Sequence, residues 1–488
     1  MATDTTLAES PGRIGPAGTP ERSTICILAL SAIADDPRVR RQADAFHRAG
    51  WNVVAIGLPG ARSPDPEWPV LTSADVLPAL PPVGGAASGR TETIASIPPA
   101  PSPAIWRASL RHTLKQRRAI RGAYRAFRTV IFPFRFGRSK LTIAYHRIRA
   151  QLSIGGRVGY AFRLLAVRIR PAIAQDIYWS FSGNIRDIHA CASRIKAAVW
   201  LANDWTMLPL AARLARENGG VYGYDTHEFA AEEYGEKRKW RLWHRPMVCA
   251  LECAFIGRAA IVSAVSAGIA DRLGEIYALP RPSIVVRNTP PFEPAVFRAT
   301  GDRVRVLYHG IVTPGRGLEA TIDSVADWRP EFDLTIRGPG AADYLGALQR
   351  RIDASSAAGR VRLAPPVAMT ALVREATVFD IGFFALPGSS RHNQFALPNK
   401  FFEYVMAGLA LCVTDLPEMG RLIRQYDLGV TLAEVEPRAI AAAINGLDRG
   451  RIDACKKQAL RAARELCWEH ESGRLVAAYA AAVRQTAG

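Results

Sequence analysis

The sequence predicts an α/β protein with parallel sheets, built as two successive halves. Residues 24–57 alternate strand, helix and strand within about thirty residues, which is typical of a βαβ unit. The same alternation returns at residue 197 and starts again at residue 303, after a Pro-rich linker at 289–292. A chain of 488 residues that is 49% apolar is long enough for two to three domains with cores.

The first unit has clear boundary signals. Residues 24–30 (TICILAL) form an apolar, β-rich run, and Asp36 followed by Pro37 is a typical helix start. Gly50 ends that helix, and residues 51–57 form the next strand. The turn lacks a G-x-G-x-x-G pattern, so a dinucleotide cofactor is not indicated.

A basic segment accounts for most of the net charge of +19. No acidic residue lies between Glu92 and Asp176, whereas this stretch holds 17 Lys and Arg residues interleaved with aromatics. Residues 61–105, rich in Pro, Ala, Gly and Ser, are expected to form a long loop or a partly disordered insert. The basic part suits an anionic membrane surface through residues 105–170, a nucleic acid or a solvated face. No zinc-finger, RNP-like or helix-turn-helix signature supports nucleic acid, which makes it an unlikely partner.

In the first half, polar residues follow two predicted strands. Residues 197–201 lead to Asn203 and Asp204, and residues 221–224 lead to a DTHE string. Ligand-binding groups of open α/β sheets lie at the carboxyl ends of the strands. Asp204 could equally cap a helix, and the histidine of the string could be structural. Further elements are expected at 208–217, 240–257, 259–266, 267–277 and 283–288.

The second half carries two glycine-rich turns. The strand at 303–308 runs into a loop with glycines at 310, 315 and 317, and Arg316 lies between the last two. Glycines let a backbone approach a ligand closely, and arginine suits phosphate. The strand at 332–337 is closed by G-P-G, and further strands are expected at 361–363 and 378–384. The default site in such a protein lies between the two halves.

Residues 397–415 (LPNKFFEYVMAGLALCVTD) predict a turn, a helix and a buried strand. Pro398 suits a first helical turn, and Gly408 is a typical helix stop. The start of such a helix favours phosphate, Lys400 could meet that phosphate, and Glu403 could accept hydrogen bonds from sugar hydroxyls. An ordinary helix with a solvated Lys and Glu is the alternative.

The chain ends and cysteines favour a cytoplasmic protein. Residues 1–22 contain acids, Pro and Gly without an apolar core, so they predict a disordered tail rather than a signal peptide. The sequence contains no run of ~18 apolar residues, so no membrane span is predicted. The seven cysteines show no metal-binding spacing, and reduced thiols are expected.

Taken together, the motifs resemble those of GT-B glycosyltransferases of family four. The resemblance rests on an ordered set over residues 24–60 and 197–485: DPRVRRQADAFHRAGWNVVAI, ANDW, YDTHE, VVRNTP, YHGIVTPGRGLE, LPNKFFEYVMAGLALCVTD and CWEHESGRLVAAYAAAV. It implies two Rossmann-like domains with parallel sheets facing a central cleft. The implied boundaries are 23–292 for an acceptor domain with a basic insert at about 61–190, 293–465 for a donor domain, and 466–488 for a helix that returns to the first domain.

The resemblance also implies a reaction and its residues. A sugar would pass from a nucleotide-sugar to a hydroxyl of a glycan or lipid-linked acceptor, with retention at the anomeric carbon, without a cofactor and without an essential metal. The implied catalytic residues are His227, Glu403 and Arg316. The implied donor-binding residues are Gly310, Arg316, Gly338, Asn393, Pro398, Asn399, Lys400 and Glu403, and residues 393–397 would line the sugar site. The implied acceptor-side residues are Asp36, Arg38, Asp204, Asp225 and Glu228.

Two positions depart from the family pattern. Phe395 stands where many members have an acid eight residues before Glu403, and Ile311 stands where many have arginine. Relatives of the P-x-K-x-x-E-Y type also lack that acid, so an active hexosyltransferase, peripheral on the inner face of the membrane, is the favoured reading. The alternatives are a degenerate, non-catalytic GT-B partner protein and a GT-B sugar-nucleotide epimerase.

Overall fold

A computed structural model describes residues 23–61, 63–75 and 163–487 of the chain. Of these, residues 23–61, 63–75 and 174–487 belong to one compact unit. The predicted tail at 1–22 lies outside the described residues, as does most of the basic segment.

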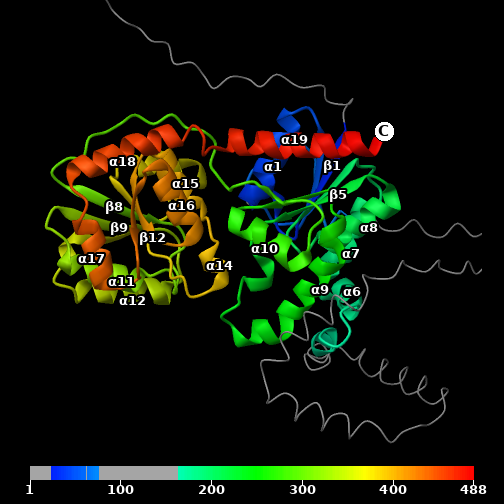
Figure 1. Ribbon diagram of the computed structural model, residues 1–488, viewed down its shortest axis with the longest axis horizontal. Helices are drawn as coiled ribbons and strands as arrows, with labels where there is room; N and C mark the ends of the chain where they lie inside the picture. The colour runs from blue at the N-terminus through cyan, green and yellow to red at the C-terminus, as the bar shows by residue number, and fades with distance from the viewer. Residues whose placement is uncertain (1–22, 62, 76–162, 488) are drawn as a thin grey trace, which may run out of the picture. The chain divides into compact units, whose positions relative to one another are not determined.

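This unit contains two parallel sheets with helices packed against them, which confirms the predicted fold class (Figure 1). The first sheet has seven strands in the order β3-β2-β1-β4-β5-β6-β7. Its strands are β1 (Thr24–Leu28), β2 (Asn52–Gly57), β3 (Val70–Thr72), β4 (Val199–Asn203), β5 (Val221–Thr226), β6 (Ile261–Ala264) and β7 (Ile284–Val285). Its helices are α1 (Pro37–Arg48), α6 (Ile173–Phe181), α7 (Gly183–Ala192), α8 (Leu208–Asn218), α9 (Arg245–Phe255) and α10 (Ala267–Tyr277).

The second sheet has six strands in the order β10-β9-β8-β11-β12-β13. These are β8 (Val304–His309), β9 (Phe332–Arg337), β10 (Val361–Ala364), β11 (Ile381–Phe384), β12 (Ala410–Thr414) and β13 (Gly429–Leu432). Its helices are α11 (Leu318–Ser324), α12 (Ala342–Asp353), α13 (Leu372–Ala376), α14 (Arg391–Gln394), α15 (Asn399–Met406), α16 (Pro417–Tyr426), α17 (Pro437–Asn445) and α18 (Arg449–Ala462). In both sheets every strand pair is parallel, so the strand ends that follow β5, β8 and β9 can carry ligand groups.

Local sequence explains the first βαβ unit. The Asp36 carboxylate accepts hydrogen bonds from the N–H groups of Arg38 and Val39, which caps α1, and Pro37 occupies its first turn. One face of α1 is apolar, and it buries Val39, Ala43 and Phe46 against the sheet. The predicted start of this helix is confirmed.

The last helix, α19 (Trp468–Ala487), returns to the first sheet, as predicted. The indole Nε1–H of Trp468 donates to the carbonyl of Arg41 at 3.1 Å. The ring of Tyr479 packs edge-on against Phe46, with ring centroids 5.6 Å apart. Figure 1 shows α19 beside α1. A helix that follows the second sheet thus completes the core of the first.

Two parts of the predicted insert are structured. Residues 61–105 were expected to be loop throughout, but β3 pairs with β2, and this prediction is wrong at 70–72. The strand is only three residues long, too short to show an alternating pattern. Helices α6 and α7 lie within the predicted insert at 61–190, and α7 buries Ile185 and Ile188. Among the described residues, no helix is both long and apolar enough to cross a bilayer.

Candidate functional site

Two glycine turns meet at the carboxyl ends of β8 and β9. The N–H of Gly310 donates to the carbonyl of Arg337 at 3.0 Å. A Cβ added to Gly338 would lie 1.9 Å from the carbonyl oxygen of Gly310, so no larger residue fits there without a shift. Both glycines have positive φ, +120° and +153°. The predicted donor-binding glycines therefore form one tightly packed backbone crossing.

Lys400 lies directly over this crossing. Its Nζ is 4.1 Å from the ring centroid of Tyr308 and 4.2 Å from that of Phe384. A Cβ on Gly310 would come within 2.9 Å of the same Nζ, so the glycine makes room for the lysine. Enclosure by protein, and then repulsion from Arg316, lower the pKa of Lys400 to about 7. The rings provide cation–π contacts but no counter-anion.

Arg316 is a second cation at the same place. It lies half-buried in the loop between β8 and α11, and it forms no ion pair or hydrogen bond with any described residue. Its charge acts on Lys400, and also on Glu228 and His392, which belong to distant parts of the chain. Two neighbouring cations without an anionic partner are suited to hold a phosphate or diphosphate.

Glu403 lies beside His309, the last residue of β8. Its Oε2 lies 2.8 Å from Nε2 of His309, although the two atoms do not meet in hydrogen-bond geometry. His309 is 1% exposed and stacks on Tyr404 with 4.7 Å between ring centroids, and its backbone N–H donates to the Tyr404 hydroxyl at 3.0 Å. Burial lowers the pKa of His309, against the effect of Glu403. The carboxylate of Glu403 thus lies against a buried imidazole.

The start of α15 is left open. Its N-cap, Pro398, supplies no side-chain hydrogen bond, so the first N–H groups, from Asn399 on, have no side-chain cap. The Nδ2 of Asn393 donates to the carbonyl of Pro387 at 2.8 Å, and its expected contact with the donor stays a prediction. The uncapped helix start, Lys400 and Arg316 are all suited to negative charge.

In the first sheet, Arg38 and Asp225 form a buried ion pair. The Nε and Nη2 of Arg38 donate to the two carboxylate oxygens, each at 2.6 Å, and the residues are 1% and 0% exposed. Ser263 and Gln42 donate to the same carboxylate at 2.6 and 2.9 Å. Burial alone would raise the pKa of Asp225, but Arg38 outweighs it and the pKa is lowered. Arg38 and Asp225 are thus occupied with each other and Asp36 caps α1, and the expected place of these residues on the acceptor side stays a prediction.

Two other carboxyls at these strand ends, those of Asp204 and Glu228, form no bidentate pair with an arginine of the described residues. Asp204 has a positive φ of +70°, and burial together with the charge of Glu233 raises its pKa to about 7. Burial and the charges of Asp204 and Glu233 raise the pKa of Glu228 to about 8. Burial and the guanidinium of Arg38 lower the pKa of His227, which favours the neutral imidazole. This side of the site is therefore acidic and hydrogen-bonding.

The two halves of the site are joined through α14. Nε2 of His392 lies 3.3 Å from Oε2 of Glu228. Phe395, at the position where an acid was expected, is turned to the first sheet: its carbonyl accepts from the Ser266 hydroxyl at 2.9 Å, and its ring packs against Phe229 with 6.3 Å between centroids. Ile311, the other departure, is 62% exposed. Thus the structure brings the predicted donor residues together with Glu228, and it adds His309 and His392.

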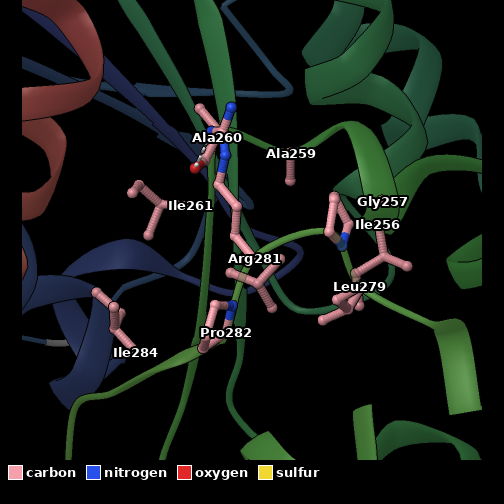
Figure 2. A pocket seen from close by; sticks show the side chains of 11 residues that line it. Ile256, Gly257, Ala259, Ala260, Ile261, Leu279, Arg281, Pro282 and Ile284 are labelled. Carbon is pink, nitrogen blue, oxygen red and sulfur yellow. Dashed lines mark hydrogen bonds between the residues drawn. The ribbon is translucent and has the colours of Figure 1, made fainter. Parts of the chain in front are cut away.

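A separate hollow lies at the opposite ends of β6 and β7 (Figure 2). Its lining is mainly apolar, with residues 256–262 on one side and 279–284 on the other, and it holds none of the predicted site residues. It therefore does not belong to the candidate site. In the described part of the chain, no group of three or more His, Cys, Asp or Glu side chains is arranged to hold a metal ion, and the expected metal independence stays a prediction.

Comparison with known proteins supports the fold. No protein-family model matches the chain, and no curated protein matches it in sequence. Among solved structures, sucrose-phosphate synthase from Thermosynechococcus elongatus is similar with a TM-score of 0.60 and 12% identity, over 95% of this chain and 99% of that one. HepE from Anabaena in complex with UDP-glucose is similar with a TM-score of 0.54, 12% identity and the same coverages.

A third similar structure is the lipopolysaccharide outer core galactosyltransferase WaaB, with a TM-score of 0.52 and 10% identity over 93% of this chain and 98% of that one. At these identities the likeness concerns the fold. The two parallel sheets of this chain match the architecture of these similar structures. The chain has the GT-B fold of glycosyltransferases.

Proposed function

We propose that the protein is a glycosyltransferase that moves a sugar from a nucleotide-sugar to a hydroxyl acceptor. The observation that carries the proposal is the pair of cations, Arg316 and Lys400, which lack an ion-pair partner in the described chain and lie at the glycine crossing of Gly310 and Gly338. This place is the carboxyl end of a parallel sheet in a GT-B fold, and HepE of the same fold is known with UDP-glucose bound.

The chemistry requires a stabilised leaving group. When the bond between the anomeric carbon and the diphosphate breaks, negative charge grows on the diphosphate, and Arg316, Lys400 and the uncapped start of α15 would stabilise it. Glu403, held beside His309, would accept hydrogen bonds from the nucleotide ribose. The neutral imidazole of His227 would face the sugars. Transfer in this proposal is hexosyl, proceeds with retention and needs no metal.

The acceptor side has a different character. Asp204 presents a carboxyl with a raised pKa, which suits hydroxyl groups better than anions. We place the acceptor among cell-envelope or surface glycans or their lipid-linked forms, and the similarity in fold to a lipopolysaccharide galactosyltransferase supports this class. The basic residues at 105–170, mostly outside the described chain, would hold the protein to the inner face of an anionic membrane.

A turnover assay tests the proposal. Purified protein is incubated with sugar-labelled UDP, GDP, ADP and dTDP donors and an extract of membrane glycolipids, with and without EDTA. We expect labelled glycolipid from one donor, in both conditions, with the donor's anomeric configuration in its NMR spectrum. Arg316→Ala and Glu403→Ala are expected to remove it, and full turnover in both variants would contradict the site.

The same assay separates the alternatives. An epimerase would convert the donor without any acceptor, and a non-catalytic partner protein would give neither product nor nucleotide binding. Flotation with anionic vesicles at low salt tests the membrane contact, and protein that stays at the bottom of the gradient would remove that part of the proposal. A mobility shift with random duplex DNA at physiological salt is expected to be negative.

A further inference from the structure

The contact between His392 and Glu228 connects segments that lie far apart in the sequence. Glu228 follows β5 of the first sheet, and His392 lies in α14, just before the helix that carries Lys400 and Glu403. The 3.3 Å distance joins Nε2 of the imidazole to Oε2 of the carboxyl. Glu228 keeps 40% of its side chain exposed, whereas His392 keeps 18%. The carboxyl can therefore contact a ligand, while the imidazole supports it from behind.

The hydrogen-bonding state of His392 follows from its surroundings. Its Nδ1 is buried and has no partner among the described residues. Because a buried N–H without an acceptor is costly, the favoured tautomer carries its proton on Nε2, the nitrogen that lies 3.3 Å from Oε2 of Glu228. Burial and the charge of Arg316 lower the pKa of His392, in agreement with a neutral ring. Oε2 of Glu228 thus lies against the ring, and Oε1 forms no hydrogen bond or ion pair with any described residue.

Arg316 places this pair next to the diphosphate. The guanidinium of Arg316 acts electrostatically on both Glu228 and His392, and it is also the cation that the proposed function assigns to the diphosphate. The sugar of a nucleotide-sugar is bonded directly to that diphosphate. Sugar hydroxyls both donate and accept hydrogen bonds, and a carboxyl with one free oxygen is a typical partner for them.

Phe395 stands where many members of the resembling family have an acid, and it cannot supply a carboxyl. Phe395 is apolar, and its ring is packed within the protein. A Cβ added to Gly268 would lie 2.3 Å from a ring atom of Phe395, and the ring of Phe229 packs edge-on against the same ring. Its carbonyl is held by Ser266. Residues 391–396 therefore pack toward the first sheet. The carboxyl near Arg316 is instead that of Glu228.

We propose that Glu228, oriented by His392, binds hydroxyl groups of the transferred sugar and thereby selects which sugar is used. This inference rests on the proposed function, because it requires that Arg316 and Lys400 hold the diphosphate of the donor. It assigns to Glu228 a donor-sugar contact in place of the acceptor contact expected from the sequence, and it makes His392 a positioning residue.

Calorimetric titration tests the inference with the full chain. The wild type is titrated with UDP, GDP, ADP and dTDP and with the matching glucose, galactose, N-acetylglucosamine and mannose nucleotides that exist for each. The sugar nucleotide that binds the wild type most tightly, and the corresponding free nucleoside diphosphate, are then used for the variants. The measured quantity is the sugar increment, the ratio of the Kd of the free diphosphate to that of its sugar form.

We expect an increment of at least tenfold in the wild type. Glu228→Leu should reduce it below twofold without weakening the free diphosphate, because a carboxyl, protonated or ionised, contributes no charge attraction for an anion. His392→Leu should reduce it by about fivefold, and His392→Gln, which keeps a donor, should restore most of it. Glu434→Leu, which replaces an exposed carboxylate of the second half, is the matched control and should leave it unchanged.

The outcomes separate the two proposals. If a diphosphate binds and the sugar increment is the same in Glu228→Leu as in the wild type, or if no sugar adds to the affinity of the wild type, the inference is overturned and the proposed function stands. If no nucleotide binds to folded wild-type protein, the proposed function itself fails. Thermal unfolding of each variant verifies that loss of the increment is not loss of the fold, and Glu228→Gln serves as the second variant if Glu228→Leu does not fold.

Discussion

The two sheets share one architecture but use charge in opposite ways at their strand ends. In the first sheet, Arg38 is buried in a saturated pair with Asp225, that is, an ion pair whose carboxylate is fully hydrogen-bonded within the protein. In the second sheet, Arg316 and Lys400 have no ion-pair partner in the described chain, and Lys400 rests on two aromatic rings. A charge whose hydrogen bonds are all satisfied inside the protein holds the fold together. A charge at a strand end that has no partner in the protein indicates a place where a ligand can supply the opposite charge.

The largest expected effect is on the saturated pair. Arg38→Met leaves the Asp225 carboxylate buried without its cation, so we expect a loss of about 3–5 kcal/mol in the free energy of unfolding. Urea denaturation followed by circular dichroism measures it. Arg48→Met, an exposed position on the same helix, should cost less than about 0.5 kcal/mol. If Arg38→Met were as stable as the wild type while losing turnover, Arg38 would belong to the site after all.

The unpaired cation should show the reverse pattern. Arg316→Ala removes one donor that stabilises the departing diphosphate, so we expect kcat to fall roughly 100- to 1000-fold with stability within about 0.5 kcal/mol of the wild type. The control is Arg374→Ala, an exposed arginine of the second half. Steady-state kinetics and denaturation on the same preparations give both numbers. Equal losses in kcat for the two variants would contradict the assignment of Arg316.

The glycine crossing predicts a smaller effect that combines both patterns. Gly338→Ala places a Cβ against the Gly310 carbonyl, so the two turns must separate. We expect a loss of about 1–3 kcal/mol in stability and weaker diphosphate binding. Gly359→Ala, whose Cβ would meet no atom within 4 Å, is the matched control. Unchanged diphosphate affinity in Gly338→Ala would show that the crossing serves the fold alone.

Lys400 makes the site pH-dependent. Its pKa of about 7 in the folded protein lies below the ordinary lysine value near 10.4, so the charged form is disfavoured by the fold. This cost is fully present below pH 7 and is relieved as pH rises from 7 toward 10, because the unfolded chain binds the additional proton over that range. Lys400→Met should therefore raise stability most below pH 7.

Ligand binding should respond to pH in the opposite direction. A diphosphate favours the charged lysine, so we expect wild-type affinity to fall as pH rises above 7, by up to about tenfold per unit. Lys400→Met should bind the diphosphate more weakly and lose this component of the pH dependence. Titrations at pH 6, 7, 8 and 9 measure both effects. A wild-type affinity that is flat over this range would show that Lys400 does not meet the anion.

The sequence predicted the second half of the site better than the first, for a physical reason. Gly310, Arg316, Lys400 and Glu403 belong to short motifs whose chemistry depends on local spacing, and the structure brings them together. The roles of Arg38 and Asp225 depend on a contact between residues far apart in the chain, and no local pattern distinguishes a buried pair from two site residues. The same limit hid His309 and His392, because their partners, Glu403 and Glu228, come from other elements.

The fold followed a similar division. Elements with clear start and stop signals, such as α1 and α15, were predicted from local sequence, and the returning α19 was expected from the family resemblance. The edge strand β3 was missed because three residues at the edge of a sheet show no period, and the domain boundaries inferred from family resemblance stay a prediction.

The most direct test of the central claim is a calorimetric titration of the wild type and Arg316→Ala with UDP, GDP, ADP and dTDP. The account predicts that one nucleoside diphosphate binds the wild type with a Kd in the micromolar range, and that Arg316→Ala weakens that nucleotide at least tenfold without loss of fold. Folded wild-type protein that binds none of the four, or an Arg316→Ala variant that binds as tightly as the wild type, would contradict it.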